Sequence, residues 1–99
     1  MKRIKGFIVL KVKVVYNDGE EFVFEKKDEF YEKFLGYTVE EIQQFYYNDL
    51  LISTSTFNGL KGYNYFIPNN SIKKISIEGI AFENLNIIDG VVVMKRGEY

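Results

Sequence analysis

The chain has 99 residues, the length of one domain with a single modest core. It contains neither Cys nor His, which excludes disulfides, thiolate nucleophiles, imidazole bases and the usual zinc ligands together. Its net charge of −1 at pH 7 creates no overall field that favours nucleic acid or an acidic surface. Any chemistry would rest on Asp, Glu, Lys, Tyr, Ser or Thr, and we expect no cofactor and no metal.

Alternating apolar residues predict a first β-hairpin, with strands over residues 6–16 and 20–25. A three-residue loop with Gly19 in a left-handed conformation keeps one face of this hairpin apolar, whereas a two-residue loop would mix the faces. The three-residue loop pairs Val14 with Phe22, Val12 with Phe24 and Lys11 with Glu25.

Charge is divided between the two halves of this hairpin. Residues 1–17 carry five basic and no acidic side chains, and residues 18–33 carry seven acidic and three basic ones. Pairing the two segments neutralises most of this charge. A cross-strand charge ladder is therefore favoured over a basic arm that binds a ligand.

Two helices are predicted after the hairpin. Asp28 can cap a first helix that ends near Leu35. Thr38 is followed three residues later by Glu41, a capping box that predicts a second helix from Val39 to about Leu50. The second helix has an apolar stripe, formed by Val39, Ile42, Phe45, Tyr46 and Leu50.

The remaining chain predicts strands. Residues 51–57 are β-prone, and Asn58-Gly59 is typical of a hairpin turn leading into an aromatic strand that ends at Pro68. This hairpin would pair Phe57 with Leu60, Thr54 with Tyr63 and Ile52 with Tyr65. A turn over residues 68–71 then leads to a strand in which Ile75 and Ile77 share a face, opposite Tyr65 and Tyr63.

The last predicted hairpin turns at Asp89-Gly90. It pairs Ile87 with Val92 and Leu85 with Met94, and residues 96–99 are expected to form a frayed tail. The order of elements predicts a single α+β domain over residues 1–99. It has a mostly antiparallel β-sheet, with two helices inserted between the first hairpin and the later strands.

The apolar stretch Phe7–Val15 is interrupted by Lys11 and Lys13. It is too short and too charged for a signal peptide or a membrane span. We therefore expect a soluble, cytoplasmic protein that does not interact with membranes.

Single-stranded nucleic acid is one candidate ligand, because aromatic rings stack on bases and lysines contact phosphates. The candidate residues for this surface are Lys61, Asn64, Phe66, Lys73 and Lys74. Tyr63 and Tyr65 are further candidate rings, on the face of the predicted strand opposite Asn64 and Phe66. The alternative is that these tyrosines cover the helices and that the lysines only solvate the sheet.

A protein interface is the favoured candidate. Eight Tyr and nine Phe exceed what a core of this size easily hides, and a sheet edge can also extend into a partner's sheet. The candidate interface residues are Tyr31, Tyr37, Tyr46, Tyr47 and Tyr63. We therefore predict a non-enzymatic protein-interaction module, in which the partner is a second copy of the chain or a host protein.

A carboxylate-dependent hydrolase is a further alternative. It would draw on acids near the first hairpin, namely Asp18, Glu20, Glu21, Glu25, Asp28, Glu29 and Glu32. Acids beside a turn and in a first helical turn already have a structural role, so this alternative is disfavoured. The hydroxyl-rich stretch Ser53–Thr56 has no His to activate a nucleophile.

The sequence as a whole is similar to one group of small proteins, and the stretches FVFEKK at residues 22–27 and YNYFI at residues 63–67 are examples of this similarity. The chain resembles small uncharacterised proteins of filamentous viruses of hyperthermophilic archaea, the lipothrixviruses and rudiviruses. Proteins of phages of A+T-rich bacteria look similar. The resemblance implies a thermostable accessory viral protein that acts in the host cytoplasm, and it supplies no catalytic residues.

Overall fold

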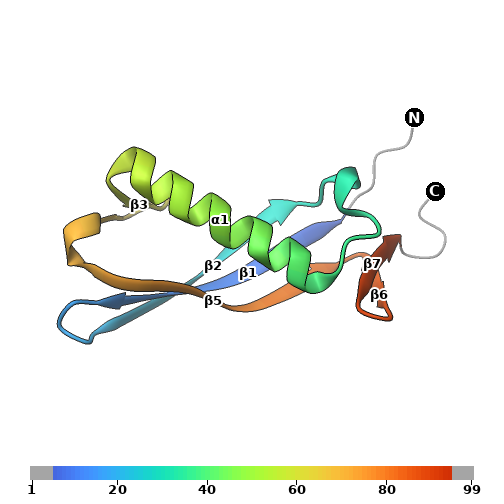
Figure 1. The fold of residues 1–99 in the computed structure, drawn as a ribbon, viewed down its shortest axis with the longest axis horizontal. Helices are drawn as coiled ribbons and strands as arrows, with labels where there is room; N and C mark the ends of the chain where they lie inside the picture. Colours follow the sequence, from blue (N-terminus) through green and yellow to red (C-terminus); the bar gives the residue numbers. More distant parts are fainter. Residues whose placement is uncertain (1–5, 95–99) are drawn as a thin grey trace.

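The computed structural model describes residues 6–94 and confirms an α+β fold with antiparallel sheets (Figure 1). One long helix lies across a three-stranded sheet. Before the helix lie β1 (Phe7–Tyr16), β2 (Glu21–Glu29) and the 3₁₀ turn η1 (Glu32–Phe34). After α1 (Val39–Phe57) follow β3 (Gly59–Lys61), β4 (Phe66–Pro68), the 3₁₀ turn η2 (Asn69–Ser71), β5 (Ile72–Glu83), β6 (Leu85–Ile88) and β7 (Val91–Met94). The expected tail at 96–99 lies outside the described residues.

The main sheet has the strand order β2-β1-β5, and all its strands are antiparallel. The predicted register of the first hairpin is confirmed: Val14 pairs with Phe22, Val12 with Phe24 and Lys11 with Glu25. Gly19 has φ +90°, and the Tyr16 N–H donates to the Glu20 carbonyl at 2.8 Å. The turn therefore fixes which residues of β1 face the helix.

The predicted first helix is wrong. Asp28 lies in β2 opposite Ile8, and only a short 3₁₀ turn follows at Glu32–Phe34. Because β1 begins at Phe7, it offers a pairing partner to β2 as far as Glu29, and this ladder overrides the weak local capping signal. Phe30 and Phe34 of this segment still enter the core, at 5% and 1% exposure.

The capping box of α1 is confirmed. The Glu41 N–H donates to Thr38 Oγ1 at 3.1 Å, and the Thr38 N–H donates to Glu41 Oε1 at 3.0 Å. The hydrogen bond from the Thr38 backbone lowers the pKa of the Glu41 carboxyl. Four residues on one side of the helix are buried, namely Ile42, Tyr46, Leu50 and Thr54.

The helix continues to Phe57, so the predicted strand over residues 51–57 and its hairpin are wrong. Thr54 extends the buried stripe one turn beyond Leu50 and so keeps the segment on the sheet. Asn58 has φ +55° and ends the helix as a left-handed cap, with its N–H directed at the carbonyls of Thr54 and Ser55. The Asn-Gly pair therefore signals a helix end here.

The predicted aromatic strand is broken into two short strands. Lys61 of β3 pairs with Phe66 of β4, and the Gly62 N–H donates to the Tyr65 carbonyl at 3.0 Å. The Tyr65 ring packs on Phe22 and Phe24, at centroid distances of 5.0 and 5.5 Å. The expected pairing of Tyr63 and Tyr65 with Ile77 and Ile75 does not form, because both tyrosines lie in the turn between β3 and β4, and these two strands form a separate sheet.

The last hairpin has the predicted register, with Ile87 opposite Val92 and Leu85 opposite Met94. Asp89 and Gly90 have φ +52° and +77°, as a two-residue turn of this type requires. A bridge between Thr38 and Val91 holds the hairpin against the start of α1.

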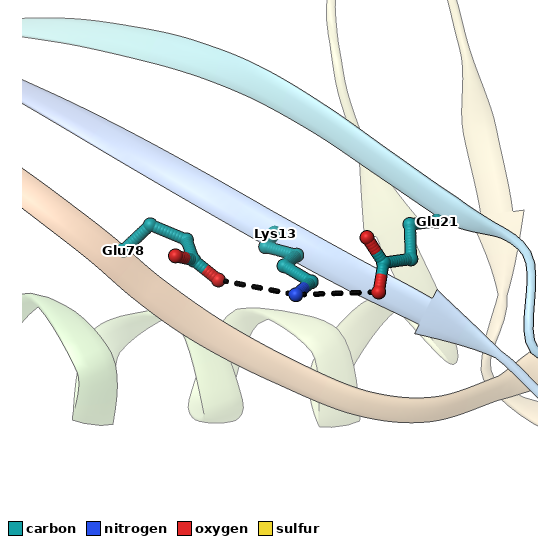
Figure 2. Close-up of polar contacts among 3 residues, drawn as sticks. All are labelled: Lys13, Glu21 and Glu78. Carbon is teal, nitrogen blue, oxygen red and sulfur yellow. Dashed lines mark ion pairs between the residues drawn. The ribbon is translucent and has the colours of Figure 1, made fainter.

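The two faces of the main sheet differ sharply. On the face below α1, Ile8, Leu10, Val12 and Val14 are buried and form the centre of the core. On the other face, the Lys13 ammonium lies 3.2 Å from Glu21 and 3.4 Å from Glu78, and these carboxylates raise its pKa (Figure 2). The predicted cross-strand charge ladder therefore lies on the face away from the helix.

Candidate functional site

A groove runs between α1 and the outer edge of β5, with a volume of about 320 Å³. Its helix side is formed by Tyr47, Leu51 and Thr54, at positions that lie one turn apart on one side of α1. Its strand side is formed by Ile72, Ile75 and the lysines 73 and 74. The groove thus has an apolar floor and a basic rim.

The outer edge of β5 has unpaired backbone groups. Within residues 6–94 this strand pairs only with β1, which lies on its inner side. Tyr16 directs its polar groups at β2, so the alternation of the ladder directs Lys13 and Val15 at β5. Their partners Ser76 and Lys74 therefore face inward, and Ile75 and Ile77 direct N–H and C=O outward.

A side chain of α1 confirms this orientation. Gln43 Nε2 donates to the Ile77 carbonyl at 3.3 Å, and it reaches that oxygen from outside the ladder. Gln43 lies one turn before Tyr47, on the same side of the helix. One ridge of α1, formed by Gln43, Tyr47 and Leu51, therefore follows the edge of β5.

The groove also contains an unsatisfied polar group. Thr54 is buried, and its Oγ1 has no hydrogen-bond partner among the described residues. A buried hydroxyl without a partner costs roughly 1–3 kcal/mol. Nearby, Asn69 Nδ2 donates to the backbone carbonyl of Thr54 at 3.2 Å and does not reach its hydroxyl.

Charge along β5 is ordered on the face opposite the helix. Lys74 and Glu78 lie on this face, on either side of Ser76. Glu78 forms an ion pair with Lys13, whereas no carboxylate of the described chain pairs with Lys74. Lys74 and Glu78 therefore give this face of β5 one positive charge without a carboxylate partner and one shared negative charge.

A second pocket of about 390 Å³ lies beyond the other side of α1, next to β3. Lys61 and Tyr63 line it, and Tyr63 is 98% exposed. The Lys61 ammonium lies 5.7 Å from the centre of the Phe57 ring, and Phe66 is its exposed cross-strand neighbour. Exposed rings and one cation thus gather at this end of the molecule.

A third pocket, of about 530 Å³, lies near η1, against the rings of Tyr31, Phe45 and Tyr46, which pack around Phe34. Its walls include Asp28, Asp49 and Tyr46, whose hydroxyl is buried without a partner. Burial, aided by Asp28, Tyr31 and Asp49, raises the pKa of Tyr46 to about 12. Within residues 6–94 no group of three or more acidic side chains could hold a metal ion.

The structure divides the predicted nucleic-acid residues between two places. Lys61, Asn64 and Phe66 lie in or beside the β3–β4 turn, whereas Lys73 and Lys74 line the groove at the start of β5. All five side chains are exposed.

Of the predicted interface tyrosines, Tyr31, Tyr37 and Tyr63 are exposed, and Tyr47 lines the groove. The prediction is wrong for Tyr46, which is 3% exposed and belongs to the core. Its spacing of four residues from both Ile42 and Leu50 indicated burial on the same side of α1.

Four groove residues were not among the sequence candidates, namely Leu51, Asn69, Ile72 and Ile75, and Thr54 was considered only within the hydroxyl-rich stretch Ser53–Thr56. The spacing of Gln43, Tyr47 and Leu51 would have indicated a helical ridge, but the expected strand from Leu51 hid it. The exposed ring of Phe57 beside Lys61 was not predicted either, because residues 51–57 were expected to form a strand.

No helix in the described part of the chain is long and apolar enough to span a membrane. Comparisons of the sequence with protein-family models and with curated proteins, and of the fold with solved structures, found no match.

Proposed function

We propose that this chain is a protein-interaction module that acts as a homodimer. The observation that carries the proposal is the groove between α1 and β5, which combines three unsatisfied features. It has one exposed apolar side chain, Leu51, beside the half-buried Tyr47 and Ile72, together with an unpaired strand edge and a buried hydroxyl without a partner. A second polypeptide that covers the groove would bury its apolar side chains and pair with its open strand edge.

A second copy is the simplest partner, since closed two-fold dimers are the commonest oligomers. The exposed aromatic residues elsewhere, such as Tyr31 and Tyr37, remain available for a different partner, including a host protein.

Sedimentation velocity over a range of micromolar concentrations tests the proposal. We expect a species of twice the 11.6 kDa chain mass.

Leu51→Glu should raise the dimer Kd at least about tenfold, because each dimer would bury two unpaired carboxylates. Ile52→Glu is the matched control: Ile52 is 66% exposed, adjacent in the helix and outside the groove. A strict monomer, or equal effects of the two variants, would contradict the proposal.

Single-strand nucleic-acid binding is a second candidate, favoured by the exposed rings around Lys61. Glu25 and Asp49 line the same pocket and oppose phosphate, which is why this candidate ranks second. If it holds, a labelled oligonucleotide should bind at low salt, and Phe66→Ala should weaken binding roughly five- to a hundredfold. The control is Tyr31→Ala, an exposed ring elsewhere. Undetectable binding in low salt would remove this candidate.

A further inference from the structure

We propose that two copies pair antiparallel through the outer edges of β5, with Ser76 of one copy opposite Ser76 of the other. The three-stranded sheets then join into one continuous six-stranded sheet. This inference rests on the proposed function, and it adds the contact strand and its register.

The backbone groups of β5 fit this pairing. Ser76 directs its polar groups at β1, so two facing Ser76 residues form a non-hydrogen-bonded pair. Ile75 and Ile77 direct theirs outward, and in this register each Ile75 faces Ile77 of the second copy. Such residues exchange both hydrogen bonds. Gln43 does not block the exchange, because the Ile77 carbonyl has a second lone pair.

The side chains fit the same register. On the face away from the helix, Lys74 meets Glu78 of the second copy, so opposite charges face each other twice. On the helix face, Ile75 meets Ile77. The Lys74 ammonium, which has no carboxylate partner in the described chain, thereby gains one.

Neighbouring registers fit poorly. Centring the pair on Ile75 would place Lys73 against Ile77 and Ile72 against Glu78, so charged groups would face apolar ones. Centring it on Ile77 would place Lys74 against Ile80, so a charged group would again face an apolar one. Only the Ser76-centred register among the three matches both charge and hydrophobicity.

The other edge of the sheet is less suited to self-pairing. In β2, Val23, Glu25 and Lys27 lie on the open face. An antiparallel pair centred on Glu25 places two glutamates against each other and Val23 against Lys27. Like charges directly opposite are unfavourable, and such residues protect an exposed edge from pairing.

The two copies of α1 would pack against each other above the joined sheet. A two-fold axis perpendicular to the sheet keeps both copies of α1 on the same face, as Figure 1 shows for one copy. The ridge of Gln43, Tyr47 and Leu51 follows the edge of β5, so it faces its own copy across the axis. Helices packed in this way cover the groove, including Leu51 and the Thr54 hydroxyl.

A cysteine at the axis tests the register. The chain has no native Cys, so Ser76→Cys introduces its only thiol. Facing residues in a non-hydrogen-bonded pair have Cα atoms about 4.5 Å apart, within the range that a disulfide spans. After mild oxidation at micromolar concentration, we expect most of the Ser76→Cys protein to run as a disulfide dimer. Ser53→Cys is the matched control, because Ser53 is also half-buried but faces the pocket beyond the other side of α1.

Charge reversal provides an independent test. Lys74→Glu places four carboxylates at the two facing pairs, and Glu78→Lys places four ammonium groups there. Each variant alone should raise the dimer Kd roughly tenfold. An equimolar mixture of the two should recover a dimer close to wild type, because every carboxylate that one variant presents at these positions then faces an ammonium group of the other.

The outcomes separate this inference from the proposed function. A monomeric wild-type chain would overturn both. A wild-type dimer without cross-linking at position 76, and without recovery in the mixture, would overturn the β5 register but leave the homodimer standing. Cross-linking at position 76 but not at 53, together with recovery in the mixture, is the result expected here.

Discussion

Replacing Phe34 by Ala is expected to lower the free energy of unfolding by about 3–5 kcal/mol. Phe34 is 1% exposed, so the substitution removes a fully buried ring and leaves a cavity. Five rings lie within about 6 Å of it, namely those of Phe30, Tyr31, Tyr37, Phe45 and Tyr46. Since domains of this size have a total stability of roughly 5–15 kcal/mol, this single change should approach the limit that the fold tolerates.

Urea denaturation followed by circular dichroism measures the effect. Phe57→Ala is the control, because Phe57 is 54% exposed at the end of α1 and should change stability by less than about 1 kcal/mol. Both variants must be compared at one protein concentration, since dimer formation contributes to the measured stability. A loss below about 1 kcal/mol for Phe34→Ala would mean that the cluster around η1 does not form.

Sequence patterns predicted the parts of this fold that are specified by neighbouring residues. Gly19 and Asp89-Gly90 fix the two hairpin turns, and the Thr38/Glu41 capping box fixes the start of α1. In each case a short-range constraint leaves few alternatives: a left-handed turn residue, or reciprocal hydrogen bonds over three positions. The α+β class followed from these elements.

The failures occurred where distant partners decide the structure. Residues 51–57 have β-prone side chains, but Leu50 and Thr54 continue the stripe that packs on β1, so tertiary contact keeps the segment helical. Asp28 has the chemistry of a helix cap, but the length of β1 draws it into a strand. Local propensity is too weak to compete with either contact.

The candidate site depends on these same long-range choices. The groove exists because α1 continues past Leu50 and because β5 adds to the free side of β1. Tyr47, Lys73 and Lys74 were singled out from sequence for two different functions, and the fold places them around one groove. Their proximity could not be read from spacing, since it requires both the helix length and the strand order.

Replacing Tyr46 by Phe is expected to stabilise the protein, with an effect that grows above pH 10. The Tyr46 side chain is 3% exposed, and its hydroxyl has no hydrogen-bond partner among the described residues. Removing a buried, unsatisfied hydroxyl should raise the free energy of unfolding by about 1 kcal/mol at pH 7.

The alkaline effect follows from proton linkage. The pKa of Tyr46 is raised from 10.0 to about 12 in the folded protein, chiefly by burial. The unfolded chain therefore loses this proton first as the pH rises, which favours unfolding between pH 10 and 12. Each unit of pKa difference corresponds to about 1.4 kcal/mol, so the wild type should lose roughly 2–3 kcal/mol over this interval through Tyr46 alone.

Urea titrations at pH 7, 10 and 11 distinguish this role from a general loss of stability in alkali. Tyr46→Phe should lose less stability than the wild type between pH 10 and 11, because its ring has no proton to release. Tyr63→Phe is the matched control: Tyr63 is 98% exposed, so its replacement should leave both the stability at pH 7 and the alkaline slope unchanged. Equal slopes for the wild type and Tyr46→Phe would show that the Tyr46 hydroxyl reaches water, and that the core beside Asp28 and Asp49 is looser than its packing indicates.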